Sequence, residues 1–209
     1  MTDNTSVEAT SQQWLAPRVV SFDSEPLILV DATDREIGHL GKLDCHRGCG
    51  VLHRAFSLFI FNDAGELLVQ QRSRFKRLWP LYWSNSCCSH PRRGESMSTA
   101  VHRRLYEELG LRTWLQFLFK FQYQAQFDST SAENELCSVF IGRGSGPIRA
   151  NSNEVAALRW IHPQQLQAEI TQHGAAQFTP WLLLEWARIC QSHGKDLASL
   201  LGAREWAFR

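Results

Sequence analysis

Two carboxylates that are two residues apart, Glu133 and Glu135, are the first groups in this sequence that could do chemistry together. If their segment is a strand, both side chains point to one face, about 7 Å apart along the chain. His46 and His53 precede an apolar segment that is predicted to be a core strand, and His90 follows a short loop. Three imidazoles and two carboxylates suit a five- or six-coordinate divalent ion such as Mn²⁺, Mg²⁺ or Zn²⁺. The sequence therefore contains a candidate metal site.

A smaller cluster offers a different metal site. Cys45, His46, Cys49 and His53 are close enough in sequence for a tetrahedral zinc site, although their spacing is not that of a standard zinc finger. In this alternative, the chain is a non-catalytic metal-binding or redox-sensing module. Its metal content would then depend on Cys45 and Cys49 and not on Glu133.

Cys88 is a candidate proton donor. A thiol with an ordinary pKa of about 8.5 is mostly protonated at neutral pH and can donate a proton. The adjacent Cys87 leaves two further interpretations open, because a vicinal pair could also be redox-active or simply buried.

A second pair of carboxylates, Glu107 and Glu108, falls on the last turn of a predicted helix, and Arg104 lies four residues before Glu108 on the same face. A carboxylate next to a basic residue at a helix end can hold Mg²⁺ against a diphosphate, because Mg²⁺ favours one or two carboxylates together with substrate phosphates. The alternative is a solvated helix with an i,i+4 ion pair, which the spacing alone favours.

The elements that must position these groups form a mixed α/β pattern. Residues 55–61 are an apolar run typical of a buried strand, and a turn at 62–65 joins it to a second strand at 66–71. Apolar residues at helical spacing predict a helix over 98–109, ended by Gly110. We expect further strands near 27–30, 82–86, 117–127, 136–143 and 155–161, a short helix from Pro163 and a longer one from Pro180 to about Cys190. The expected fold class is α/β (α+β), with a mixed β-sheet flanked by helices.

Length and composition limit the classes of function. The 209 residues suit a single domain over 26–193, with a flexible leader over 1–25 and a C-terminal tail over 194–209. The 22 basic and 21 acidic residues give a net charge of +1, which argues against a nucleic-acid binder. No apolar run reaches the ~18 residues of a membrane span, and the N-terminus lacks a secretory signal. We therefore expect a cytoplasmic protein with reduced cysteines.

Several motifs, in a fixed order, resemble the type 1 isopentenyl-diphosphate isomerases, which share the Nudix fold. The segment from Trp83 to Pro91 matches their W-x-N-x-x-C-x-H-P signature, and the resemblance extends from about Leu27 to Trp181. The other matching segments are Ala55-Phe56-Ser57, Trp79-Pro80, Gly94-Glu95-Ser96 and Glu133-Asn134-Glu135-Leu136-Cys137.

The predicted helix also resembles a Nudix box, the loop–helix–loop signature of the wider superfamily. Ser89 stands where the box has its first Gly, and Arg104 replaces a Glu that Nudix hydrolases use to gather metal ions. The resemblance therefore supports the fold and argues against hydrolysis, so a Nudix hydrolase of a nucleoside diphosphate derivative is the second hypothesis. The matching residues are Glu95, Arg103, Leu105, Glu107, Glu108, Gly110 and Leu111.

The resemblance implies that isopentenyl diphosphate is protonated to a tertiary carbocation, which then loses a proton to give dimethylallyl diphosphate. It assigns Cys88 and Glu135 to opposite faces of the substrate, with Tyr123 beside Glu135. It assigns Trp181 to the pocket, where an aromatic face can stabilise the cation. The expected partner is a small allylic or homoallylic diphosphate, and we expect a monomer.

The resemblance also implies the groups that hold the ions and the diphosphate. One divalent ion would be held by His46, His53, His90, Glu133 and Glu135, and Mg²⁺ would bridge Glu108 and the diphosphate. The residues expected to bind the diphosphate are Lys42, Arg72, Lys76 and Arg104.

Overall fold

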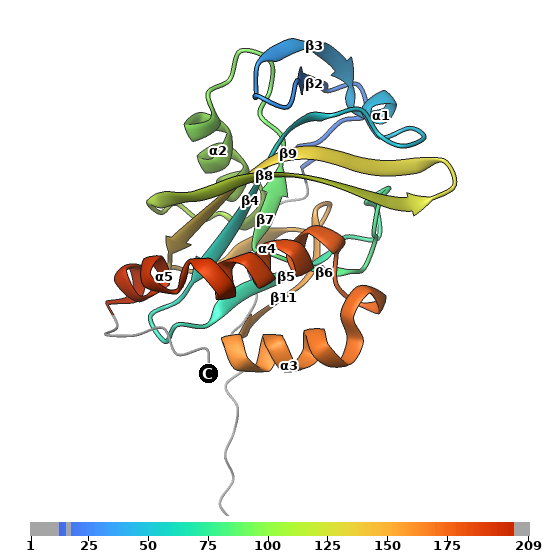
Figure 1. Cartoon of the computed structure of the whole chain (residues 1–209). Coiled ribbons are helices and arrows are strands. Elements are labelled where there is room, and N and C mark those ends of the chain that lie inside the picture. The colour runs from blue at the N-terminus through green and yellow to red at the C-terminus, as the bar shows by residue number, and fades with distance from the viewer. Residues whose placement is uncertain (1–12, 16–17, 203–209) are drawn as a thin grey trace, which may run out of the picture.

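Strand β4 (His53–Phe61) lies at the centre of the computed structural model, which describes residues 13–15 and 18–202 (Figure 1). It pairs in parallel with β9 (Ser131–Arg143), in antiparallel with β7 (Cys87–Ser89), and meets β5 (Leu67–Arg72) at a hairpin turn. Alternate side chains of β4 point to opposite faces of the sheet, and both faces are covered. This double burial explains why residues 55–61 are apolar at every position except Ser57.

The described strands form a nine-stranded mixed sheet and a separate two-stranded one, which confirms the expected fold class. The long hairpin of β8 (Leu115–Asp128) and β9 crosses the molecule in Figure 1. The order β11-β5-β4-β2-β3 gives the main path of the large sheet, in which β11 is Val155–Ile161, β2 is Pro26–Val30 and β3 is Glu36–Gly41.

Helix α2 (Met97–Leu109) covers one face of the sheet. Its residues Val101 and Leu105 pack against Phe56 and Leu58 of β4 in a buried cluster. The Ser96 hydroxyl caps the helix by accepting a hydrogen bond from the backbone N–H of Thr99 at 3.1 Å. Gly110 ends it in the left-handed conformation, with φ of 67°. The helix predicted over 98–109 and its glycine stop are therefore confirmed.

The opposite face is covered by helices from the C-terminal part of the chain (Figure 1). Leu182 and Trp186 of α4 (Pro180–Ser192) pack against Phe59 and Phe61, the alternate residues of β4. The short helix α3 (Pro163–His173), followed by one 3-10 turn at Gly174–Ala176, contributes Leu166 to the same cluster. Both helices begin at the prolines from which they were predicted.

Regular secondary structure occurs in both segments that were expected to flank the domain. In the segment expected as a tail, α5 (Gly194–Leu201) packs through Leu197, which is fully buried. Leu197, Leu200 and Leu201 share one helical face, so this segment continues the apolar cover of the sheet. In the expected leader, β1 (Gln13–Leu15) pairs with β10 (Arg149–Asn151). Residues 1–12, 16–17 and 203–209 of the leader and tail lie outside the described part.

Two local features differ from the sequence expectation. The strand expected near 82–86 is two short strands, β6 (Trp83–Ser84) and β7, separated by Asn85 and Ser86. Strand β3 and the short helix α1 (Lys42–Cys45) were not predicted, because neither has enough apolar residues for a clear period. No helix among the described residues is long and apolar enough to cross a membrane.

Candidate active site

One cavity of about 720 Å³ receives side chains from α1, from the loop after β5, from β7 to β9 and from the start of α4. Cys88 and Glu135 both line it, although they lie on strands that flank β4 on opposite sides. The residues singled out from the sequence that line this cavity are Lys42, His46, Arg72, Lys76, Cys88, His90, Arg104, Tyr123, Glu133, Glu135 and Trp181. Among the residues to which the family resemblance gives a catalytic, metal-binding or substrate-binding role, the two that do not line it are His53, which is fully buried beside His90, and Glu108.

Strand pairing brings the carboxylates and histidines together. Glu135 on β9 pairs with His53 in the parallel ladder with β4 and with Tyr123 in the antiparallel ladder with β8. Residues paired in this way point to the same face of the sheet. Glu133 precedes Glu135 by two residues, so it shares that face.

The geometry of this group fits a divalent cation. The ligand atoms of His46, His53, His90 and Glu133 all lie within 4.8 Å of one another. His53 Nδ1 is 2.7 Å from the carbonyl of Val51, which leaves Nε2 facing the group, 3.1 Å from Nε2 of His90. Nε2 of His46 and Oε2 of Glu133 are 2.9 Å apart, yet neither has a hydrogen-bond partner among the described residues. Ligand atoms that converge without satisfying one another can hold a metal ion.

Burial and hydrogen bonds together set the protonation of this group. Burial lowers the pKa of His90 well below its usual value, so the imidazole is neutral and keeps a lone pair for a ligand. Burial alone would raise the pKa of Glu135, but hydrogen bonds with His53 and His90 hold that pKa well below its usual range. Oε2 of Glu135 also accepts a hydrogen bond from the Tyr123 hydroxyl at 2.7 Å. Glu135 is therefore an ionised carboxylate fixed on both of its oxygens.

The thiol of Cys88 and the indole of Trp181 both contact Arg72. Nη1 of Arg72 is 3.8 Å from Sγ of Cys88, and its guanidinium carbon lies 5.0 Å from the centroid of the Trp181 ring. Burial raises the pKa of Cys88 to about 12, although the Arg72 cation acts in the opposite direction. Cys88 is therefore a protonated thiol at neutral pH. Burial also raises the pKa of the adjacent Cys87, which is fully buried and not poised for redox chemistry.

Cations line another part of the cavity. Burial, followed by repulsion from the Lys76 and Arg104 cations, lowers the pKa of Lys42 to about 8. Nζ of Lys42 donates to Oγ of Ser21 at 2.6 Å, and Lys76 forms an ion pair with Glu154. Because these cations repel one another, a bound diphosphate would relieve the repulsion and favour the charged form of Lys42.

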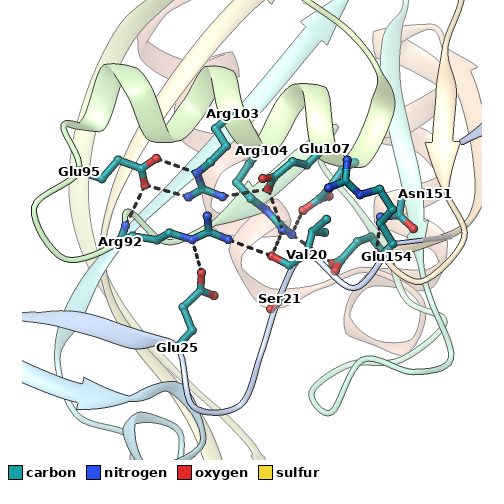
Figure 2. Close-up of polar contacts among 12 residues, drawn as sticks. Val20, Ser21, Glu25, Arg92, Glu95, Arg103, Arg104, Glu107, Asn151 and Glu154 are labelled. Carbon is teal, nitrogen blue, oxygen red and sulfur yellow. Dashed lines mark hydrogen bonds and ion pairs between the residues drawn. The ribbon is translucent and has the colours of Figure 1, made fainter. Parts of the chain in front are cut away.

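Arg104 is held from several sides, as Figure 2 shows. It forms an ion pair with Glu108 one turn later, Nη2 lies 3.2 Å from Glu154, and Nη1 donates to the carbonyl of Val20 at 3.0 Å. The exposed fractions of Arg104 and Glu108 are 2% and 1%, so the i,i+4 pair considered above is buried and not solvated. Glu108 faces Arg104, while only Arg104 lines the cavity.

Three other matches to the Nudix box, Glu95, Arg103 and Glu107, fasten the loop before α2 to the helix. Arg103 donates to both oxygens of Glu95, at 2.7 and 2.8 Å, and to Glu107 at 2.9 Å (Figure 2). Oε2 of Glu95 also accepts from the backbone N–H of Arg92 at 2.9 Å. These contacts give the three residues a role in holding the fold.

Some residues in or beside the cavity were not predicted from the sequence. Glu154 and Ser21 engage Lys76 and Lys42, and the carbonyl of Val20 engages Arg104. Glu154 directly precedes a predicted strand, which was the one signal available for it. Ser21 and Val20 belong to the expected leader, whose composition gave no signal.

The alternative zinc site is not supported by the geometry. The metal-capable group found among the described residues contains no cysteine. Cys45 is buried with Sγ 3.6 Å from the carbonyl of Leu40, and Cys49 is exposed. His46 and His53 turn instead toward His90.

Comparisons with known proteins agree with this description. The NUDIX domain family matches residues 51–182. Isopentenyl-diphosphate Delta-isomerase 1 of Photorhabdus laumondii is 45% identical over 172 residues, covering 81% of this chain and 97% of that protein. Isopentenyl-diphosphate Delta-isomerase of Nocardia farcinica is 41% identical, covering 75% of this chain and 90% of that protein. A crystal structure of a Deinococcus radiodurans protein superposes with a TM-score of 0.64 at 25% identity, covering 80% of this chain and 99% of that one.

Proposed function

Since the chain belongs to the NUDIX domain family and, within it, to the isopentenyl-diphosphate Delta-isomerases, we propose that it converts isopentenyl diphosphate to dimethylallyl diphosphate. The enzyme is an intramolecular isomerase that moves a carbon–carbon double bond by protonation and deprotonation. The reaction needs two proton-handling groups on opposite sides of a flat substrate and a dry site for the tertiary carbocation between them.

Cys88 and Glu135 are the proposed proton-handling groups. The thiol of Cys88 carries a proton at neutral pH, and the carboxylate of Glu135 is ionised. Each group acts as the acid in one direction of a reversible isomerisation and as the base in the other. The hydroxyl of Tyr123, which donates to Glu135, is placed to orient that carboxylate and to share its proton.

Trp181 is the proposed stabiliser of the carbocation. Its ring is 3% exposed and packs edge-on against Trp79, with centroids 5.4 Å apart. An indole face attracts a cation by about 0.5–2 kcal/mol, and more strongly where water is excluded. The Arg72 cation near this ring is evidence that its face accepts positive charge.

Lys42, Arg72 and Lys76 are the proposed anchors of the diphosphate, with Arg104 behind them. Arg104 is already engaged by two carboxylates and a carbonyl, whereas Lys42 contacts Ser21 and Lys76 is paired with Glu154, so each lysine has fewer contacts to give up when it turns toward a ligand. Binding of the substrate's charged end would hold its short hydrocarbon end near Cys88 and Glu135.

Two divalent ions complete the proposal. One ion, Mn²⁺, Mg²⁺ or Zn²⁺, would be held by the converging ligand atoms of His46, His53, His90 and Glu133. Glu135, whose Oε1 is 3.0 Å from Nε2 of His90, would be the fifth ligand, and the charge of the ion would fix this carboxylate and tune its proton affinity. A Mg²⁺ ion would accompany the diphosphate through Glu108. Because Glu108 is paired with Arg104, this second site requires Arg104 to release the carboxylate.

One arrangement carries the proposal: a protonated thiol, an ionised carboxylate and an indole line the same cavity as a group of cations. The direct test is incubation with ¹³C-labelled isopentenyl diphosphate and Mg²⁺ or Mn²⁺ in D₂O, followed by NMR. We expect labelled dimethylallyl diphosphate that has acquired deuterium. Release of a nucleoside monophosphate from nucleoside diphosphate derivatives, with no isomer formed, would instead identify a Nudix hydrolase.

A further inference from the structure

Asn85 belongs to the signature around Cys88 but takes no part in the proposed proton transfer or in the binding of metal and diphosphate. It lies in the gap between β6 and β7 and is fully buried. Its Nδ2 donates to the carbonyls of Leu58 and Cys87, at 3.2 and 2.9 Å. A side-chain amide has two N–H donors and an oxygen with two lone pairs. Both donors of Asn85 are therefore used on backbone next to the reactive thiol.

The amide oxygen of Asn85 is turned toward the indole of Trp181. Oδ1 accepts a hydrogen bond from Oγ of Ser84 at 2.9 Å and one from Nε1 of Trp181 at 3.1 Å. Nε1 of Trp181 is also 2.9 Å from Oγ of Ser84, which in turn lies 3.0 Å from Oγ1 of Thr179. Ser84, Asn85 and Thr179 are each fully buried. Ser84 and Asn85 thus converge on one indole N–H, and Thr179 contacts the first of them.

The backbone strengthens this connection. The backbone N–H of Thr179 donates to the carbonyl of Trp83 at 2.9 Å, and the N–H of Trp83 donates to the carbonyl of Gln177 at 2.8 Å. The segment that leads to Cys88 is therefore fastened directly to the start of α4. These backbone bonds do not involve the indole, whereas Oδ1 of Asn85 accepts a directional hydrogen bond from its N–H.

We propose that Asn85 is a positioning residue, which fixes the indole of Trp181 relative to the strand that carries Cys88. This inference rests on the proposed function, because it gives the orientation of the two groups a catalytic purpose. An apolar neighbour would fill the same space but would remove one of the two acceptors that hold the N–H edge of the ring. A hydrogen bond to the N–H edge selects one orientation of the ring face, and an attractive contact with a cation depends on that face.

Misplacement of a reacting or stabilising group by about 1 Å can lower a rate by about 100-fold. We therefore expect N85A to lower kcat by about 10- to 100-fold, while KM changes by less than about threefold. KM is expected to hold because the lysines that would anchor the diphosphate engage other residues: Lys42 contacts Ser21 and Lys76 contacts Glu154. N151A is the matched control, since Asn151 is also buried and hydrogen-bonded but lies on β10.

The hydrogen bond between Asn85 and Trp181 can also be measured without any turnover of substrate. In a ¹H–¹⁵N spectrum, the indole N–H of Trp181 is assigned as the resonance that W181F removes. We expect this resonance to shift and to exchange faster with solvent in N85A and, to a smaller extent, in S84A, and to stay in place in N151A. S84A removes only one of the two acceptor oxygens, so it tests the contact even if N85A does not fold.

A double-mutant cycle tests whether the hydrogen bond between Asn85 and Trp181 contributes to kcat. Phenylalanine at position 181 has no N–H, so N85A should cost less in a W181F background than in the native protein. A native indole resonance and a native kcat in folded N85A would overturn the inference and leave the proposed isomerase intact. Conversely, a native protein that forms no dimethylallyl diphosphate would remove the proposed function, while the resonance would still report whether Asn85 holds the indole.

Discussion

Tyr123 and Glu135 face each other in the β8–β9 ladder, and the tyrosine hydroxyl donates to Oε2 of the carboxylate at 2.7 Å. On the other side of Glu135, β4 supplies His53 as its partner in the parallel ladder. The carboxylate is thus fixed by strand register on both sides. A proton-transfer group held in this way can meet a substrate in one orientation without first losing rotational freedom.

Replacing Glu135 by glutamine tests its proton-handling role, because glutamine keeps the shape of the side chain but cannot transfer a proton. We expect E135Q to lower kcat by about 10²–10⁴-fold, and C88A to do the same, with native folds. Turnover by either variant close to the native rate, measured by NMR of labelled substrate, would contradict the assignment. E133Q is the control for metal binding, since it removes a candidate ligand and leaves Glu135 in place.

Metal affinity should depend on the group formed by His46, His53, His90 and Glu133 and not on the cysteines near it. We expect E133Q to weaken metal affinity by about 10- to 100-fold, and excess metal to restore part of its activity. C49S should leave the metal content unchanged, because Cys49 is exposed and outside the group. Metal analysis after dialysis against a chelator decides the question. Loss of metal in C49S with retention in E133Q would revive the cysteine site.

Cys88 should react slowly with alkylating reagents despite its place in a cavity. Its pKa is raised to about 12 by burial, so its thiolate fraction at pH 8 is about 10⁻⁴. We expect iodoacetamide to modify the exposed Cys49 first, as mapped by mass spectrometry. Modification of Cys88 should become faster as pH rises. A Cys88 that is alkylated at neutral pH before Cys49 would show a thiolate in the resting protein.

Local motifs explain why much of the site could be predicted. Asn85, Cys88 and His90 lie within six residues of one another, so their spacing is visible in the sequence. Glu133 and Glu135 follow the strand period, and β9 does present them on one face. The buried strand at 55–61 and the helix before Gly110 are strong periodic signals as well.

The rest depends on contacts between distant segments. Glu154 contacts Lys76 and Arg104 only after β11 has paired with β5, and no spacing in the sequence predicts these contacts. The carbonyl of Val20 engages Arg104 through backbone, which carries no side-chain signature. The pairing of Arg104 with Glu108 was visible as an i,i+4 spacing, but its burial was not.

Glu185 provides a prediction about stability that does not depend on catalysis. It lies on α4 one turn after Trp181, is fully buried, and accepts from Sγ of Cys137 at 3.4 Å. Burial raises the pKa of Glu185 to about 8, against the effect of hydrogen bonds with Ser57 and Cys137. In the unfolded chain, a glutamate has a pKa of about 4.3. Between these two values the folded protein keeps the proton that the unfolded chain has lost.

Because the folded state binds more protons in that window, the free energy of unfolding falls as pH rises, by up to about 1.4 kcal/mol per pH unit. The contribution of Glu185 is complete below about pH 4.3 and is lost by about pH 8. E185Q is neutral at every pH, so its stability relative to the native protein should increase across this range. Urea unfolding from about pH 5 to about pH 8, at fixed metal concentration, measures the difference. The exposed Glu36 gives the control E36Q, and a pH-independent difference for E185Q would mean that Glu185 is ionised in the folded protein.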